Sequence, residues 1–369
     1  MPDSFVSGMS GRLTIETREE IWPLKQPFRI SRGTRTEAQV VVVTVSDGEH
    51  IGRGECVPVG RYNQSTASVL AQIESVKTDG NLDRQTLQER LPAGAARNAL
   101  DCALWDFESK VSGKRAWELE KILLVPEVET SFTISLDTPE KMGAAAGASA
   151  NLPTLKLKLG GDDLDLSRVE AVREAAPAAR LLIDANESWS PEHYSKIVPG
   201  LRELGIELIE QPFPAHLDDV LQTLDHPIPV CADESCHTTA DLPRLRNRYE
   251  AVNVKLDKTG GLTEALRLCE RARENDFKLL IGCMVCTSLG IAPARLLPSF
   301  ANRIAKPGES RGYLNRKDTS VPLESPQLAA VSDTTWVDLD GPLFLVRDRD
   351  HAVPYVNGKI GIPPRDLWG

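Results

Sequence analysis

The sequence predicts an α/β protein in which a closed (β/α) barrel follows a smaller α+β region. From about residue 130, short apolar segments alternate with amphipathic ones, which is the pattern of strands and helices around a parallel sheet. These units recur at short and regular intervals, which favours a closed barrel over an open sheet. No GxGxxG segment follows a predicted strand, which weakens a dinucleotide-binding interpretation.

The first third of the chain predicts strands followed by helices. Residues 12–57 hold two alternating runs of apolar and polar residues joined by the "SDGE" turn, which indicates a hairpin. Residues 65–112 have a helical pattern that ends before Gly113. Near the other end of the chain, "TTWVDLDGPLFLV" is predicted to hold a further strand. Residues 303–335 lack periodicity and are expected to form a long loop or an insertion.

Composition and charge exclude several classes of protein. The 369 residues carry a net charge of -10 without a basic tract, so binding to nucleic acid or to anionic membranes is not expected. No apolar run reaches the length of about 18 residues that a membrane span needs, and the N-terminus lacks the layout of a signal peptide. The seven cysteines are scattered, which is typical of reduced thiols in a cytoplasmic protein. A redox or metal role for Cys283 and Cys286, which have CxxC spacing, stays open.

Ionisable residues stand at the ends of successive predicted strands. They are Lys158, Asp184, Glu210, Asp233 and Lys255. Chemistry in a (β/α) barrel lies where strands end, and barrel closure brings these ends to one rim. Three converging carboxylates repel one another unless a cation joins them, and oxygen ligands select a hard divalent ion, Mg²⁺ before Ca²⁺ or Mn²⁺.

The segment "LKLKLG" places lysines among these carboxylates. Lys156 and Lys158 alternate with leucines and therefore share one face of a strand, which in a barrel points inward. Two ammonium groups close to each other and to a metal disfavour the charged form, so we expect one of them to become a neutral amine. With Lys255 on the other flank, such a site suits proton transfer at a carbon next to a carboxylate.

These segments resemble the motifs of the enolase superfamily, in its muconate-lactonizing-enzyme-like branch. The matching pieces are "KLK" at 156–158, "DAN" at 184–186, "EQPF" at 210–213, "ADES" at 232–235 and "NVK" at 253–255. The resemblance implies a modified (β/α)7β barrel in residues 125–342. It also implies an α+β capping domain formed by residues 1–124 and the returning C-terminal segment 343–369.

The resemblance also implies a role for each of these residues. Asp184, Glu210 and Asp233 would hold one Mg²⁺ per subunit, and Lys158 and Lys255 would be the opposed acid and base of a 1,1-proton transfer through a metal-stabilised enediolate. Lys156 would lower the pKa of Lys158. Asn186 and Glu234 would be polar supports.

The segment "DLDG" at 338–341 resembles the DxD motif of dipeptide epimerases. There Asp338 and Asp340 would grip the free ammonium group of a dipeptide. Thr133, Cys283 and Met284 would line the pocket. Arg29 resembles the arginine that grips the glutamate carboxylate in epimerases of L-Ala-Glu dipeptides, which implies a glutamate-containing substrate and a context of murein peptide recycling.

Other functions on the same scaffold stay open: N-acylamino acid racemase, muconate cycloisomerase and o-succinylbenzoate synthase, or a hydrophobic dipeptide specificity. A non-catalytic barrel that binds a metal or a ligand is the alternative from a different class. Hydrolysis by a Ser-His-Asp triad is disfavoured because no histidine stands at the end of a predicted strand. The expected partner is a small dipeptide, and assembly into a homo-oligomer stays open.

Overall fold

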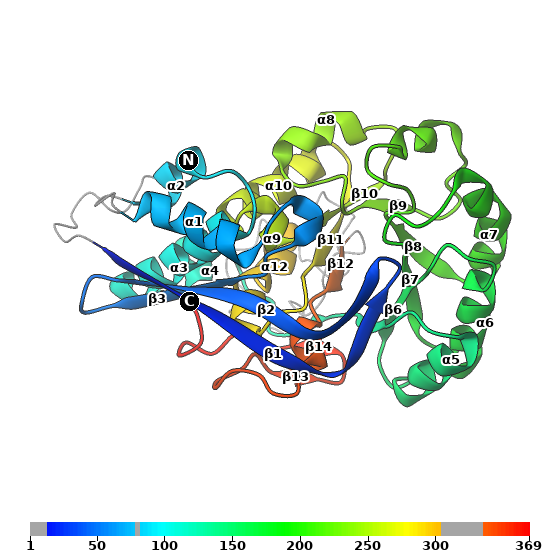
Figure 1. The fold of residues 1–369 in the computed structure, drawn as a ribbon, viewed down its shortest axis with the longest axis horizontal. Helices are drawn as coiled ribbons and strands as arrows, with labels where there is room; N and C mark the ends of the chain where they lie inside the picture. Colours follow the sequence, from blue (N-terminus) through cyan, green and yellow to red (C-terminus); the bar gives the residue numbers. More distant parts are fainter. Residues whose placement is uncertain (1–12, 78–81, 304–334) are drawn as a thin grey trace, which may run out of the picture.

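The computed structural model describes residues 13–77, 82–303 and 335–369, and its fold is drawn in Figure 1. The chain begins with an antiparallel sheet in the order β1 (Thr14–Ile30), β2 (Gly33–Ser46) and β3 (Ile51–Cys56). The turn between β2 and β3 falls on the predicted "SDGE" segment, with Gly48 at a φ of 96° that favours glycine. The hairpin prediction is therefore confirmed.

The β1–β2 hairpin is longer than the sequence predicts. Pairing continues from Trp22↔Ala38 to Ile30↔Gly33, across a register shift between Pro23 and Phe28. The prolines interrupt the alternation, so residues 25–33 resemble a loop in sequence. Figure 1 shows the hairpin tip reaching over the barrel towards β6 and β7.

The helices of the first third pack on this sheet. They are α1 (Thr66–Val76), α2 (Arg84–Arg90), α3 (Ala95–Ser112) and the short α4 (Ala116–Leu119), with the 3₁₀ turn η1 (Gly60–Tyr62) before α1. Helix α3 lies directly on β3. A Cβ on Gly52 of β3 would stand only 2.2 Å from the carbonyl oxygen of Ala103, so this close approach requires a glycine. Helix α3 ends with Gly113 at its C-cap, as predicted.

Parallel strands then form a barrel. They are β5 (Phe132–Ile134), β6 (Thr154–Lys158), β7 (Arg180–Asp184), β8 (Ile206–Glu210), β9 (Val230–Ala232), β10 (Ala251–Val254), β11 (Lys278–Gly282) and β12 (Thr335–Asp338). They pair in chain order from β5 to β12. Ser131 N donates to Val337 O at 2.9 Å, which brings the first and last strands together. The predicted barrel with an α+β cap is confirmed.

Helices cover the outside of the barrel, but not after every strand. The helices that follow the barrel strands are α5 (Pro139–Ala148), α6 (Asp165–Ala175), α7 (Pro191–Glu203), α10 (Leu262–Glu274), α11 (Ser288–Ala294) and α12 (Leu297–Arg303). The short α9 (Leu256–Thr259) is buried against α3 of the cap. The amphipathic helices predicted after β8 and β9 are wrong. Those connections hold only η2 (Asp218–Thr223), η3 (Thr239–Asp241) and the four-residue α8 (Leu242–Leu245).

The C-terminal segment returns to the cap side of the molecule. Strand β14 (Lys359–Ile360) pairs with β4 (Val128–Glu129) on one side and with β13 (Tyr355–Val356) on the other. Trp368 Nε1 donates to Cys102 O of α3 at 2.9 Å. The proposed domain boundaries near residues 124 and 342 stay predictions. Most of the irregular 303–335 stretch lies outside the described residues.

An apolar layer fills the barrel interior beneath the strand ends. It consists of Leu182, Leu208, Cys231, Ala251, Leu280 and Trp336. Several of these stand two positions before a charged residue on the same strand and so face the same way. The charged rim therefore rests on a floor that excludes water. No helix among the described residues is long and apolar enough to cross a bilayer.

Candidate active site

The charged strand ends meet at one rim of the barrel. Strand pairing sets Lys158 beside Asp184 and Asp184 beside Glu210. Asp233 and Lys255 follow directly after β9 and β10. All five side chains are buried, the most exposed being Lys158 at 8%. The structure thus brings together every strand-end residue that the sequence singled out.

The two lysines lie on opposite flanks of the carboxylates. Lys158 Nζ is 2.6 Å from Asp184 Oδ2, whereas Lys255 Nζ is 2.7 Å from Asp233 Oδ2 and 3.8 Å from Glu210 Oε1. Glu210 therefore stands between the two amines, held by Asn253 Nδ2, which donates to its Oε1 at 2.7 Å. A substrate carbon above Glu210 would have one amine on each side.

Lys156 connects the carboxylates from inside the barrel. Its Nζ lies 2.6 Å from Glu210 Oε2, 2.7 Å from Asp338 Oδ2 and 3.4 Å from Asp184 Oδ2. Burial alone would lower the pKa of Lys156, but the charges of Asp338 and Glu210 hold it well above its usual range. Lys156 therefore keeps its proton, which suits a residue that repels a second proton nearby.

The carboxylates also act on Lys255, on the other flank. The neutral amine expected among the lysines next to a bound metal stays a prediction. Burial alone would lower the pKa of Lys255, but Asp233 and Glu210 raise it well above the ordinary lysine value. The pKa of Glu210 is also raised, but here burial and the charge of Asp184 outweigh the nearby lysines. The lysines and carboxylates of the rim thus neutralise one another, and a lysine can lose its proton only when another cation takes over the carboxylates.

Asp184, Glu210 and Asp233 have the donor atoms that Mg²⁺ prefers, but their oxygens face ammonium groups here. Among the described residues, no group of three or more His, Cys, Asp and Glu side chains is arranged to hold a metal ion. The residue types fit: three buried carboxylates next to one another need a positive counter-charge, and the lysines now supply it. Metal binding would replace part of these ion pairs.

Lys258 is a buried residue of the rim that the sequence analysis missed. Its Nζ donates to both Asp233 O and Asp233 Oδ1 at 2.6 Å and to Asn253 O at 2.9 Å. It therefore orients a predicted metal ligand from below. The available signal was the spacing in "KLDK", which places Lys258 one helical turn beyond Lys255.

The aspartates of "DLDG" are both buried but have different partners. Asp338 ends β12 and accepts from Ser131 Oγ at 2.6 Å in addition to its contact with Lys156. Asp340 precedes η5 (Gly341–Phe344) and accepts from Thr133 N at 2.7 Å. Burial and the charge of Asp338 raise the pKa of Asp340 to about 7. Within the described part of the chain, Asp338 pairs with a lysine, whereas no lysine forms an ion pair with Asp340.

The segment after β11 packs against the same turn. A Cβ on Gly341 would lie 2.7 Å from Met284 O and 3.0 Å from Cys286 N, so the backbone of 284–286 borders the "DLDG" turn. Cys283 and Met284 are partly exposed there. All seven cysteines are free.

The cap reaches the rim through Arg32. Its Nη2 donates to Glu234 Oε1 at 2.6 Å and its Nη1 to Asn186 O at 2.7 Å. Burial and the charge of Asp233 raise the pKa of Glu234 to about 7. Arg29 is exposed on β1, where its backbone oxygen accepts from Leu136 N. The side chain of Arg32 therefore contacts the barrel, whereas Arg29 contacts it through its backbone, and the substrate role of Arg29 stays a prediction.

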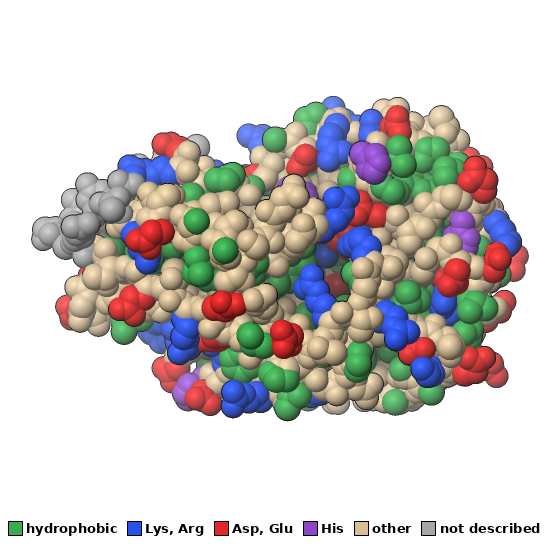
Figure 2. Space-filling view, viewed as in Figure 1, with side chains coloured by type: hydrophobic (Ala, Val, Ile, Leu, Met, Phe, Trp, Pro, Cys, Tyr) green, Lys and Arg blue, Asp and Glu red, His purple; other side chains and the backbone are tan. Residues whose placement is uncertain are grey.

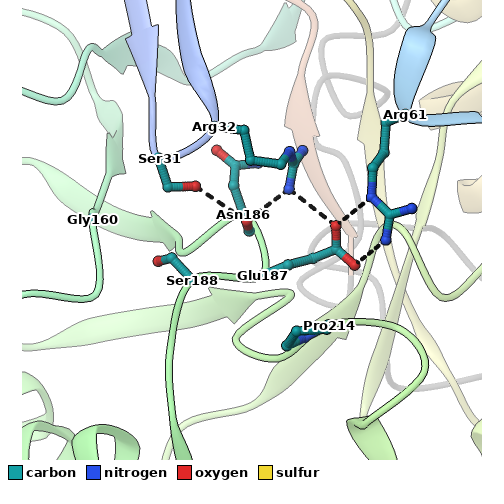
Figure 3. Close-up of a pocket in the computed structure, with 8 residues that line it drawn as sticks. All are labelled: Ser31, Arg32, Arg61, Gly160, Asn186, Glu187, Ser188 and Pro214. Atoms are coloured by element: carbon teal, nitrogen blue, oxygen red, sulfur yellow. Dashed lines mark hydrogen bonds and ion pairs between the residues drawn. The ribbon is translucent and has the colours of Figure 1, made fainter.

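Asn186 and Glu234, the predicted polar supports, flank the carboxylate cluster. Asn186 N donates to Asp184 Oδ1 at 2.9 Å. On the face shown in Figure 2, Lys and Arg side chains gather around the hollow between the β1–β2 hairpin and the barrel. Arg32 and Arg61 line a pocket of about 370 Å³ at this junction, and Figure 3 shows both pointing towards Glu187.

A capped barrel with opposed lysines around three carboxylates defines a class of enzyme. The chain belongs to the enolase superfamily: residues 141–364 match the family described as enolase C-terminal domain-like. Residues 12–119 match the mandelate racemase / muconate lactonizing enzyme N-terminal domain. The family prediction is thereby confirmed.

Particular relatives are similar over nearly the whole chain. The L-Ala-D/L-Glu epimerase of Escherichia coli (strain K12) is 42% identical, covering 94% of this chain and 99% of that protein. The N-acetyl-D-glutamate racemase of Pseudoalteromonas sp is 39% identical, covering 89% of this chain and 95% of that protein.

A crystal structure of an enolase family member from Agrobacterium tumefaciens, described with bound sodium and L-Ala-L-Glu, superposes with a TM-score of 0.85. The two chains are 42% identical, and the match covers 97% of this chain and 100% of the Agrobacterium chain. A dipeptide epimerase from Methylococcus capsulatus, complexed with Mg and L-Arg-D-Lys, gives a TM-score of 0.80 at 28% identity. The match covers 95% of this chain and 97% of the Methylococcus chain.

Proposed function

We propose that the chain is a Mg²⁺-dependent dipeptide epimerase that inverts the Cα of the C-terminal residue, with L-Ala-Glu dipeptides as substrates. The observation that carries this proposal is the placement of Lys158 and Lys255 on opposite flanks of the carboxylate cluster. Epimerisation needs an acid and a base on opposite faces of one carbon. The L-Ala-D/L-Glu epimerase of Escherichia coli supports the substrate class.

In this mechanism each group has one task. Asp184, Glu210 and Asp233 would hold the metal. Mg²⁺, when bound, supplies positive charge for the substrate carboxylate and so makes the neighbouring Cα–H more acidic. One lysine removes the Cα proton and the other delivers a proton to the opposite face. Lys156 stays protonated and holds Glu210 and Asp338 from inside the barrel.

Racemisation of N-acetylglutamate is a second candidate, because the Pseudoalteromonas racemase is 39% identical. The two substrates differ in the free ammonium group, which only the dipeptide carries. Asp340 favours the dipeptide, because its buried carboxylate is not matched by a lysine and can accept an ammonium donor.

The proposal is tested by deuterium wash-in at Cα in D₂O with Mg²⁺. L-Ala-L-Glu and L-Ala-D-Glu are expected to exchange and interconvert, with N-acetyl-D-glutamate and a hydrophobic dipeptide reacting more slowly. Faster exchange of N-acetyl-D-glutamate would make the racemase the better assignment. No exchange with any of a broad panel would favour a binding protein.

The variant Asp340→Asn is expected to raise KM for L-Ala-L-Glu by about tenfold or more, because a charge-assisted hydrogen bond is lost. For the unmodified protein, KM should fall as the pH rises through about 7 and Asp340 ionises. KM should rise again above about pH 8 as the substrate ammonium loses its proton. In Asp340→Asn, the change of KM around pH 7 should disappear, whereas the rise of KM above about pH 8 should remain. Equal KM values for both proteins at every pH would contradict this assignment.

Arg32 is expected to determine the preference for glutamate. Its described contacts with Asn186, Glu187 and Glu234 use three of its five N–H groups, so others can reach a substrate carboxylate. Arg32→Ala should lower the ratio of kcat/KM for L-Ala-L-Glu over L-Ala-L-Leu by about tenfold or more. Arg29→Ala is the matched control from the same hairpin. A larger change in that ratio for Arg29→Ala would restore the prediction made from sequence.

The cellular setting is a further part of the proposal. We propose that the protein acts in the cytoplasm on dipeptides released from murein. Seven free cysteines, most of them buried, are in keeping with a reducing compartment. Cells that lack the gene should accumulate L-Ala-D-Glu, as measured by mass spectrometry of extracts.

A further inference from the structure

Glu187 joins separate parts of the molecule through one carboxylate. Arg61 of η1 donates to it twice, from Nε at 2.8 Å and from Nη2 at 2.7 Å. Arg32, beside the tip of the β1–β2 hairpin, donates from Nη1 at 3.2 Å. Ala215 N, in the loop after β8, donates at 2.9 Å. Figure 3 shows the two guanidinium groups approaching Glu187 from the cap.

The backbone at Glu187 is held in a conformation that its side chain does not favour. Asn186 and Glu187 have φ angles of 45° and 66°, in the left-handed region. Asparagine tolerates this region, but glutamate has no local reason to adopt it. Glu187 N donates to Gln211 O at 2.8 Å, which helps to hold the turn. This unfavourable backbone conformation directs the Glu187 carboxylate towards the cap.

The adjoining pocket is not an anion site of its own. Its two arginines already face carboxylates: Arg61 pairs with Glu187, and Arg32 pairs with Glu187 and Glu234. Positive and negative charges therefore balance, so the pocket has no surplus positive charge that would hold an anion by itself. The Glu187 side chain is only 6% exposed, so its ion pairs are less screened than surface pairs.

The segments that Glu187 holds are those that cover the active site. The hairpin tip carries Arg32, which contacts Glu234 beside the predicted metal ligand. Segment η1 carries Tyr62, whose ring packs edge-on against His237 with centroids 4.5 Å apart. Burial, and after it the charge of Asp233, raises the pKa of Tyr62.

We propose that Glu187 is a positioning residue whose carboxylate clasps the β1–β2 hairpin tip and η1 over the barrel rim, and so determines how tightly the substrate is held. Glu187 acts through Arg32 and Arg61. The substrate-dependent part of the test rests on the proposed epimerase function, whereas the clasp itself can be measured without substrate.

The variant Glu187→Gln keeps the size of the side chain and removes its charge. We expect KM for L-Ala-L-Glu to rise by about tenfold while kcat changes by less than about threefold. The reason is that the hairpin tip and η1 are held less firmly over the bound substrate, whereas the lysines that transfer protons are unchanged. Amide hydrogen exchange should become faster in residues 30–34 and 59–63. The double variant Glu187→Gln/Arg61→Gln should be no worse than Glu187→Gln alone, because both changes break the same interaction.

Glu207→Gln is the matched control. Glu207 also binds an arginine through both oxygens, with Arg180 Nε 3.0 Å from Oε1 and Arg180 Nη2 2.7 Å from Oε2, but it lies near the start of β8, away from the cap. It should leave KM and cap exchange unchanged. Unchanged cap exchange in Glu187→Gln, or a KM change no larger than that of Glu207→Gln, would overturn the clasp. If the unmodified protein turns over no dipeptide, the proposed function fails, and hydrogen exchange still decides the clasp.

Discussion

Lys158→Met and Lys255→Met are each expected to abolish epimerisation, and the two variants should fail on opposite epimers. Because the amines lie on opposite flanks of Glu210, each faces one side of the substrate carbon. Each variant should therefore retain deuterium exchange from one epimer of L-Ala-Glu and lose exchange from the other by about 10²–10⁴-fold. Proton NMR of both dipeptides in D₂O measures all four rates.

The control for this experiment is Lys141→Met. Lys141 also forms an ion pair, 3.1 Å from Asp137, but its side chain is 70% exposed on α5. It should leave all exchange rates unchanged. Removing a lysine leaves a buried carboxylate with one partner fewer, which can destabilise the fold. Circular dichroism is therefore needed to show that each rim variant is folded. If both rim variants lose exchange from the same epimer, the amines do not act on opposite faces.

Glu210→Gln is expected to lower both Mg²⁺ affinity and turnover by about 100-fold or more, because the central carboxylate of the cluster loses its charge. Burial and the charge of Asp184 raise the pKa of Glu210, so the charged form of this carboxylate gains stability from an added cation. Mg²⁺ should therefore raise the melting temperature of the unmodified protein by binding the folded state. Glu210→Gln should lose most of that increase, and chelation should abolish turnover until Mg²⁺ is added back.

Titration calorimetry with Mg²⁺ alone separates this effect from catalysis. Glu207→Gln serves again as the control, since Glu207 precedes Glu210 on the same strand but pairs with Arg180 outside the cluster. Mg²⁺ affinity in Glu210→Gln equal to that of the control would show that Glu210 is not a ligand.

Much of the barrel could be predicted because its signals are local. The alternation in "LKLKLG" indicates that Lys156 and Lys158 share a face, and every residue of β6 is buried as that interpretation requires. The position of Asp184 at the end of β7 follows from the length of one apolar run. Parallel strands then bring these ends together without further information.

Other parts of the site depend on contacts between residues far apart in the chain. The sequence predicts Arg29 as the arginine of the hairpin, but the β1–β2 pairing leaves Arg29 exposed and carries Arg32 to the barrel. The segment "DLDG" predicts two equivalent aspartates, yet Asp338 is already paired with Lys156. Neither outcome can be derived from a pattern within one segment.

By itself, the sequence determined the barrel, its cap and the identities of the charged strand ends, because periodicity and strand length act over a few residues. Only the tertiary structure decided which charges meet: Lys158 with Asp184, Lys258 beneath Asp233, and Glu187 with two arginines of the cap. The physical reason is that an ion pair depends on distances of a few ångströms between segments separated by many residues. Those distances are set by the closure of the barrel and the packing of the cap on it.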